Sequence, residues 1–160
     1  MSILLKNCKY LVTQNEDREI LNNVDVGIKD KKVEEISKES SKNYEKIIDC
    51  SEKIVMPGLI NTHTHAGMAI MRGYSDDKPL FPWLDDMWEL EKQLTPRKIK
   101  IGASLSILEM LKTGTTSFVD MYFDLDEVPD LIERAGIKGY IGSLIYDPEK
   151  LSVGKNPSNH

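Results

Sequence analysis

The spacing of hydrophobic and polar positions changes near residue 57, and this change divides the chain into two predicted regions. Before that point, short apolar or alternating stretches are separated by polar turns; the stretches are residues 3–5, 10–12, 24–28, 33–36, 46–50 and 53–56. Such stretches are typical of half-buried strands. We therefore expect residues 1–56 to form a small antiparallel β domain, with the polar residues 37–46 as a solvated loop.

From residue 57 onward, apolar runs and helix-period stretches alternate. Strands are predicted at residues 59–62, 115–122 and 138–146, with a short helix at 127–135 and a longer one from residue 96. This strand–helix alternation predicts a parallel sheet. Residues 57–146 therefore form a predicted βαβαβ region, and the polar residues 147–160, which lack periodicity, form an irregular tail.

The longer helix has clear boundary signals. Thr95 is a suitable N-cap, Pro96 suits the first helical position, and Gly114 suits the left-handed residue that ends a helix. Three apolar residues spaced four and three apart predict the face that packs inward: Ile101, Leu105 and Leu108.

Two of the three histidines, His63 and His65, stand at the end of the apolar run 54–62. Residues two apart on a strand point to the same side, so both imidazoles should project together. Two neutral imidazoles aimed at one point are suitable ligands for a metal such as zinc. Two exposed loop histidines are the alternative, and the spacing alone leaves both interpretations open.

The connection between the first predicted strand and the long helix contains a second amphipathic stretch, residues 81–91. Its apolar side would bury Trp83, Leu84 and Met87 as a lid, or would present a tryptophan face and a carboxylate to a ligand. In the same connection, Arg72 is predicted to pair with one of two nearby aspartates, Asp76 or Asp77.

Asp120 is the polar residue near the end of the second predicted strand of this region. It would either cap a neighbouring loop or line a substrate site, because the carboxyl ends of parallel strands carry the active sites of barrel enzymes.

Composition narrows the class of protein. The chain has 160 residues, 40% hydrophobic and 29% charged, with a net charge of −5. These values are typical of a soluble globular protein and argue against nucleic acid or an anionic membrane as the partner. No run reaches the roughly 20 apolar residues of a membrane span. Cys8 and Cys50 are interpreted as free thiols, so we expect a cytoplasmic protein.

The motifs of the second region resemble the amidohydrolase superfamily, and within it the deaminases of 5-methylthioadenosine and S-adenosylhomocysteine. The resemblance is carried by four stretches: Met56-Pro57-Gly58-Leu59-Ile60-Asn61-Thr62-His63-Thr64-His65, Met71-Arg72-Gly73-Tyr74-Ser75-Asp76-Asp77, Trp83-Leu84, and Gly114-Thr115-Thr116-Ser117-Phe118-Val119-Asp120-Met121-Tyr122. It implies an α/β fold: the first three strands of a (β/α)8 TIM-type barrel, preceded by half of a small β-sandwich.

The resemblance also implies a site. His63 and His65 would bind a divalent metal, zinc or in some members iron. Glu91 would bind the ribose of a small-molecule nucleoside, with Trp83 and Asp120 also in the substrate site. Two features depart from the family pattern: Glu89 stands where the family usually has proline, and the stretch between Trp83 and Glu91 is one residue short. Glu89 therefore remains a second, weaker candidate for the ribose contact.

The remaining family ligands and the proton-transferring glutamate would lie beyond residue 160. The resemblance therefore implies the N-terminal part of a metal-dependent aminohydrolase that is inactive alone. Alternatives are a hydrolase of guanine, cytosine or triazines, and a non-enzymatic module or half of a hetero-complex. A homo-oligomer or a complementing C-terminal chain is the expected protein partner.

Overall fold

The computed structural model describes residues 1–143. The chain divides into two compact units, Met1–Pro57 and Gly58–His160, each with its own sheet. The first unit contains five strands: β1 (Ser2–Val12), β2 (Ile20–Lys29), β3 (Lys32–Ser37), β4 (Lys46–Asp49) and β5 (Ile54–Val55).

The sheet of the first unit is mixed rather than antiparallel, so that part of the prediction is wrong. Strands β1, β2 and β3 form an antiparallel meander, whereas β4 and β5 both pair with β1 in parallel. The stretches predicted at residues 3–5 and 10–12 are one continuous strand, β1, with an irregular register between Leu5 and Cys8. Asn7 lies at this bulge with a φ of 57°.

The core of the first unit is a cluster of five buried side chains from β1, β2 and the residue after β4: Cys8, Leu11, Val24, Val26 and Cys50. The sequence predicted alternation along residues 24–28, but Asp25 is also buried and only 1% exposed. Its carboxylate accepts hydrogen bonds from the backbone amides of Asn7 at 2.8 Å and Ser40 at 3.0 Å. The buried aspartate thus joins the bulge of β1 to the loop after β3 through these two hydrogen bonds.

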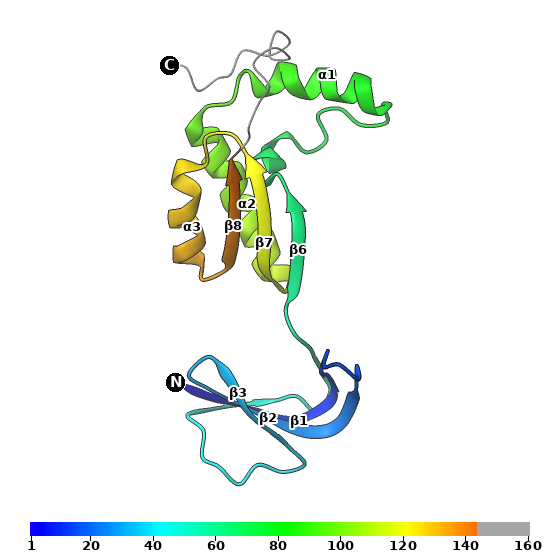
Figure 1. Ribbon diagram of the computed structural model, residues 1–160, viewed down its shortest axis with the longest axis vertical. Coiled ribbons are helices and arrows are strands. Elements are labelled where there is room, and N and C mark those ends of the chain that lie inside the picture. Colours follow the sequence, from blue (N-terminus) through cyan, green and yellow to red (C-terminus); the bar gives the residue numbers. More distant parts are fainter. Residues whose placement is uncertain (144–160) are drawn as a thin grey trace. The chain divides into compact units, whose positions relative to one another are not determined.

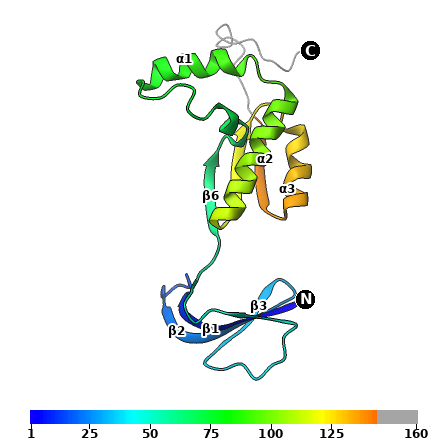
Figure 2. The ribbon, with the colours of Figure 1, turned by 180° about the vertical axis from the view of Figure 1, so that it is seen from behind.

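The second unit has a parallel sheet in the order β6-β7-β8, which confirms the strand–helix alternation. Its elements are β6 (Leu59–Thr64), the 3-10 helix η1 (Ala66–Met71), α1 (Leu80–Glu91), α2 (Pro96–Thr113), β7 (Thr115–Tyr122), the 3-10 helix η2 (Leu125–Glu127), α3 (Val128–Ala135) and β8 (Lys138–Ser143). Helices α2 and α3 lie on the same face of this sheet (Figures 1 and 2). Residues 144–146 of the predicted third strand, and the predicted tail, lie outside the described residues.

The predicted boundaries of α2 are confirmed. The Thr95 side chain accepts a hydrogen bond from the Lys98 amide, and Gly114 adopts the left-handed conformation with a φ of 88°. Gly136 ends α3 in the same way, with a φ of 71°. In the part of the chain that the structure describes, no helix is long and apolar enough to cross a membrane.

The face of α2 that packs inward differs from the predicted one. The predicted residues Ile101, Leu105 and Leu108 are exposed, and the buried residues are instead Ile99, Gly102, Ala103 and Ile107. Helix α2 carries apolar residues on two sides, and its neighbours are η1, β7, η2 and α3. The apolar spacing alone therefore did not identify the side that faces the sheet.

Candidate functional site

The two histidines at the end of β6 lie side by side. The Nε2 atoms of His63 and His65 are 3.3 Å apart, and the ring planes are nearly perpendicular at 87°. The intervening Thr64 points the other way, with its hydroxyl 2.9 Å from both the Val119 carbonyl oxygen and Asp120 Oδ1. The structure thus brings the two imidazoles together as the alternation of a strand requires.

A main-chain contact fixes the tautomer of His65. Its Nδ1 atom lies 2.6 Å from the carbonyl oxygen of Met121. A carbonyl can only accept, so Nδ1 carries the proton and donates it. In the neutral ring the lone pair is therefore on Nε2, the atom that faces His63. Hydrogen bonding of the second ring nitrogen is the usual way in which proteins orient a metal-binding histidine.

The spacing of the two nitrogens fits a metal ion. Two ligands about 2.0–2.1 Å from a tetrahedral zinc are separated by about 3.3–3.4 Å, which matches the 3.3 Å observed here. Among residues 1–143, no group of three or more histidine, cysteine, aspartate or glutamate side chains could hold a metal. The two histidines are therefore two candidate ligands, whereas a catalytic zinc normally takes three from protein.

Asp120 secures the loop that carries the histidines. Its side chain is fully buried, at 0% exposure. Oδ1 accepts a hydrogen bond from the Ala66 amide at 2.8 Å and lies 2.9 Å from the Thr64 hydroxyl. It thus contacts the residues on either side of His65. The capping interpretation fits this geometry, and the place of Asp120 in a substrate site stays a prediction.

The other oxygen of Asp120 is unusual. Oδ2 is buried and has no hydrogen-bond partner among the residues that the structure describes. An unsatisfied buried carboxylate oxygen is costly, and such atoms are rare in native structures. Only half of this carboxylate is used for holding the loop.

Close backbone packing sets the position of η1, the turn that follows His65. A Cβ added at Gly102 of α2 would lie 2.1 Å from the carbonyl oxygen of Gly67, so a side chain there would displace the turn. A Cβ on Gly67 would lie 2.8 Å from the Tyr122 ring. The Ser106 hydroxyl also donates to the Ala66 carbonyl oxygen at 2.9 Å. The end of β6 is therefore held from the α2 side as well as from β7.

Glu91, at the end of α1, belongs to the same cluster. Its Oε1 accepts a hydrogen bond from the Tyr122 hydroxyl at 2.8 Å, and the Tyr122 ring lies 6.2 Å from that of His65. Burial raises the pKa of Glu91 above its usual range, while the Tyr122 hydroxyl and the charge of His65 act in the opposite direction. The carboxylate is thus half-buried and is held on the side of the histidines.

The structure separates Glu91 from the other glutamate that the sequence nominated. Glu89 is exposed and pairs with Lys92 on the helix surface. Trp83 is half-buried in the first turn of α1, eight residues from Glu91, a rise of about 12 Å along a helix. No described contact joins Trp83 to the histidines. Met87 is buried as the lid interpretation predicted, and Trp88 is 42% exposed.

Two features of this region were not predicted. Arg72 forms its ion pair with Glu109 of α2, with nitrogen–oxygen distances of 2.9 and 2.7 Å, rather than with Asp76 or Asp77. Tyr122 was not nominated, although its position two residues after Asp120 places it on the same side of β7. That period-two relation was the signal that could have identified it.

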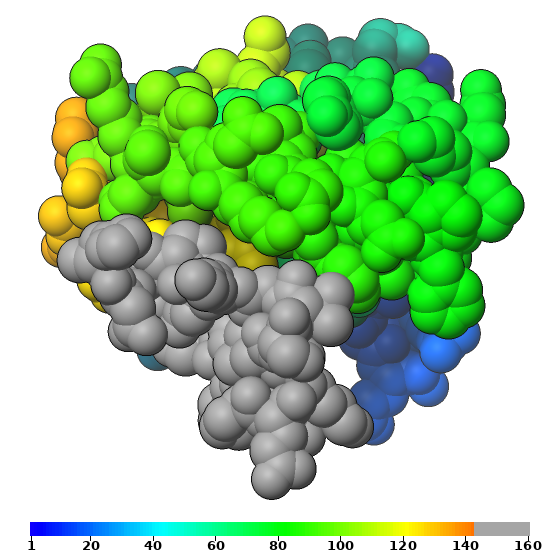
Figure 3. Space-filling model, turned by 90° about the horizontal axis from the view of Figure 1, so that it is seen from above, coloured from blue at the N-terminus to red at the C-terminus, as the bar shows by residue number. Residues whose placement is uncertain are grey.

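The cluster lies at the carboxyl ends of the parallel strands. In a view toward this end of the second unit, α1 and the connection that leads to it extend across the surface (Figure 3). Carboxyl ends of parallel strands are where barrel enzymes build their sites from strand-to-helix loops.

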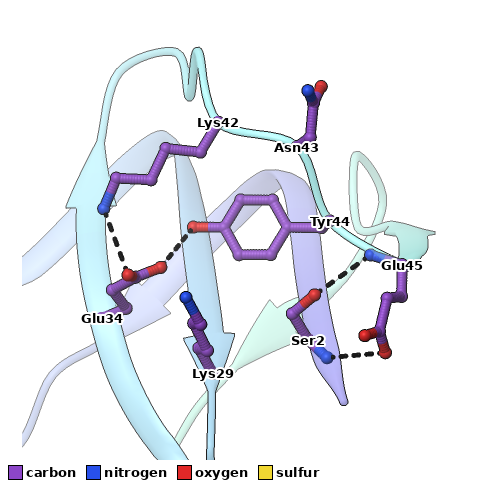
Figure 4. A pocket seen from close by; sticks show the side chains of 7 residues that line it. All are labelled: Ser2, Lys29, Glu34, Lys42, Asn43, Tyr44 and Glu45. Atoms are coloured by element: carbon purple, nitrogen blue, oxygen red, sulfur yellow. Dashed lines mark hydrogen bonds and ion pairs between the residues drawn. The ribbon is translucent and has the colours of Figure 1, made fainter.

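A separate pocket in the first unit has polar walls (Figure 4). Several of its lining groups bind one another: Lys42 pairs with Glu34 at 3.6 Å, and the Ser2 amide donates to Glu45 at 3.1 Å. The Tyr44 hydroxyl points toward the same glutamate as Lys42, at 3.4 Å. The lining contains neither a histidine pair nor a buried carboxylate, so it does not resemble the cluster at the end of β6.

Comparison with known proteins agrees with the geometry. Residues 54–156 match the model of the amidohydrolase family. A 5-methylthioadenosine/S-adenosylhomocysteine deaminase of Halothermothrix orenii is 38% identical over 162 residues, which cover 98% of this chain and 38% of that protein. A 5'-deoxyadenosine deaminase of Methanosarcina barkeri is 43% identical over 137 residues, which cover 85% of this chain and 32% of that protein.

A similar solved structure is an adenosine deaminase from Xanthomonas campestris with bound zinc. Its TM-score is 0.80 at 26% identity, and the match covers 86% of this chain and 32% of that one. The chain thus spans about a third of the length of its relatives. Since the family model matches more than half of the chain, the chain belongs to the amidohydrolase family.

Proposed function

We propose that this chain supplies the N-terminal metal ligands and a substrate-binding carboxylate of a metal-dependent hydrolase that deaminates an adenosine-type nucleoside. The observation that carries the proposal is the convergence of His63 and His65 Nε2 at 3.3 Å. The names of the relatives support the substrate class, and the zinc of the Xanthomonas campestris structure supports the metal. Iron is the alternative ion, because imidazole ligands also suit it.

The chemistry divides between the metal and the residues of the chain. A divalent metal at this pair would lower the pKa of a water toward about 7 and so supply the nucleophile. His65 Nδ1–H donates its hydrogen bond to the Met121 carbonyl oxygen, which leaves the lone pair of Nε2 available to bind the metal. Asp120 holds both neighbours of His65 in place.

Glu91 supports a nucleoside over a free base. A half-buried carboxylate can accept two hydrogen bonds from sugar hydroxyls, which a free guanine, cytosine or triazine lacks. Its link through Tyr122 places it on the side of the histidines, where a substrate would lie. We therefore favour Glu91 over Glu89 for the ribose contact, and place Trp83 outside the group in direct contact with the sugar.

The proposal extends to the fold. Strands β6, β7 and β8 correspond to the first three strands of a (β/α)8 barrel, with the first unit as part of a small β-sandwich. In the described part of the second unit, α2 and α3 lie on the same face of the sheet, and Ile60 and Tyr140 are 70% and 65% exposed. Further barrel strands, from the same polypeptide or a complementing chain, would bring the remaining ligands.

The test compares two preparations. One is the 160-residue chain alone, and the other is the chain co-expressed with the C-terminal remainder of the Halothermothrix orenii relative. Zinc content and ammonia release are measured with 5-methylthioadenosine, S-adenosylhomocysteine and 5'-deoxyadenosine. We expect stoichiometric zinc and activity only in the second preparation, and loss of both in His63→Ala and His65→Ala.

The matched control is Glu89→Gln beside Glu91→Gln. We expect Glu91→Gln to impair nucleosides far more than free bases, and Glu89→Gln to change neither. Equal impairment of both substrate classes by Glu91→Gln would favour a hydrolase of guanine, cytosine or triazines. Zinc bound by an inactive preparation would favour a non-enzymatic module.

A further inference from the structure

The last residue of β7, Tyr122, connects the two parts of the candidate site. It is 4% exposed, and its hydroxyl donates to Glu91 Oε1 at 2.8 Å. The two residues are 31 positions apart and belong to different elements, the end of β7 and the end of α1. This bond therefore ties the helix that crosses the strand ends to the sheet beneath it.

The phenol ring of Tyr122 is held on several sides. It lies 4.6 Å from the Phe123 ring at 48°, and 6.2 Å from the His65 ring at 43°. The backbone of Gly67 packs directly on it, because a Cβ there would come within 2.8 Å of the ring. A ring enclosed in this way presents its hydroxyl in one place.

Glu91, by contrast, needs an external restraint. A glutamate side chain loses much rotamer freedom when it is fixed, which costs free energy. The Tyr122 hydroxyl is the one hydrogen-bond partner of its carboxylate within residues 1–143. Oε2 is thus left to accept hydrogen bonds from a ligand, in a position that the tyrosine has already set.

We propose that Tyr122 is a positioning residue that orients Glu91 for ribose binding and so determines the preference for nucleosides over free bases. This inference rests on the proposed function. Tyr122 itself would donate no hydrogen bond to a bound ligand, because its hydroxyl donates to Glu91. The tyrosine acts by holding the carboxylate in the geometry that two sugar hydroxyls require, so that the ligand does not have to fix it.

The central experiment is Tyr122→Phe, which removes the hydroxyl and keeps the ring that packs on Gly67. The matched control is Tyr10→Phe in the first unit, where the side chain is 43% exposed. Loss of a hydrogen bond to a charged group is expected to weaken binding about tenfold. We expect Tyr122→Phe to raise KM for the nucleoside about tenfold, to leave kcat within about twofold, and to leave free bases unaffected.

A double-mutant cycle separates positioning from general packing. In the Glu91→Gln background, Tyr122→Phe should have little further effect on KM, because the carboxylate to be positioned is gone. An undiminished effect in that background would overturn the inference. So would a fall in kcat at unchanged KM, or a response no larger than that of Tyr10→Phe.

Equilibrium binding distinguishes this inference from the proposed function. The dissociation constants of inosine and hypoxanthine are measured by calorimetry for the wild type and Tyr122→Phe. Suppose that the wild type binds inosine more tightly than hypoxanthine and that Tyr122→Phe binds the two equally. The inference then stands even when no ammonia is released, and only the proposed function fails. If the wild type shows no such preference, the inference fails.

Discussion

Within residues 1–143, each unit encloses one carboxylate almost completely, and the two carboxylates are used differently. Asp25 of the first unit accepts a backbone hydrogen bond on each oxygen, from Asn7 and from Ser40. Asp120 of the second unit accepts both of its hydrogen bonds on Oδ1, and Oδ2 has no partner among the described residues. Burial alone does not separate them, because they are 1% and 0% exposed.

The difference lies in what each carboxylate holds. Asp25 joins a bulge to a loop, and with both oxygens satisfied it is a structural residue. Asp120 holds the two neighbours of a candidate metal ligand while keeping an unsatisfied oxygen. Buried polar atoms without a partner call for an explanation, and a functional site is one of the usual ones. An incompletely satisfied carboxylate is therefore the better indicator of a site.

The largest expected effect is that of Asp25→Asn on stability. The amide has one acceptor oxygen, so one of the two backbone amides would face an NH2 group instead of an oxygen. We expect a loss of about 3 kcal/mol in the free energy of unfolding of the first unit, measured by denaturant titration. Unchanged stability would show that the carboxylate is not holding the bulge and the loop together.

Asp120→Ala should act mainly on metal binding. Loss of an orienting partner typically weakens metal affinity about 10–100-fold. We expect a fall of that size in zinc affinity, measured by calorimetry on the co-expressed preparation. Asp25→Ala is the control, and an equal fall in that variant would remove the distinction between the two carboxylates. Retention of the far-ultraviolet circular dichroism spectrum establishes that the Asp120 variant is folded.

Asp120→Asn sharpens the same comparison. The amide oxygen can replace Oδ1, and the NH2 group takes the place of an oxygen that no described donor contacts. We therefore expect a loss of stability within about 1 kcal/mol, well below that of Asp25→Asn. The measurement is the same denaturant titration. A larger loss at position 120 than at position 25 would mean that Oδ2 has a donor after all.

The smallest effect concerns the thiols in the core of the first unit. Cys8 is buried, and burial together with the neighbouring Cys50 raises the pKa of its thiol to about 11. Since the thiolate is the reactive form, Cys8 of the native protein should react negligibly with a disulfide reagent at pH 8, and burial shields Cys50 from the reagent. Reactivity should increase as the pH approaches 11, and both thiols should react at once in denaturant. Rapid reaction of the native protein at pH 8 would contradict this account of the core.

Local geometry explains what the sequence predicted well. The convergence of His63 and His65 follows from the two-residue period of a strand, and the ends of α2 follow from the conformations of Thr95 and Gly114. These features depend on neighbours in the chain. The strand–helix alternation of the second unit was predictable for the same reason.

The features that sequence reasoning missed depend on contacts between distant residues. The hydrogen bond of Tyr122 to Glu91 spans 31 positions, and that of Asp120 to Ala66 spans 54. Nothing in the spacing of Arg72 predicted its pairing with Glu109. The inward face of α2 was missed because the helix offers two apolar sides. A sequence pattern shows that a face is apolar, and only the packing shows which neighbour covers it.

The hydrogen bond between His65 Nδ1 and the carbonyl oxygen of Met121 determines which substitutions the site tolerates at position 121. The acceptor belongs to the peptide backbone, so replacing the side chain at position 121 does not remove it. A substitution of Met121 therefore leaves the proton of His65 on Nδ1, although Met121 is the residue whose backbone sets that position. The side chain at position 121 can therefore change while Nε2 of His65 keeps the lone pair that faces His63.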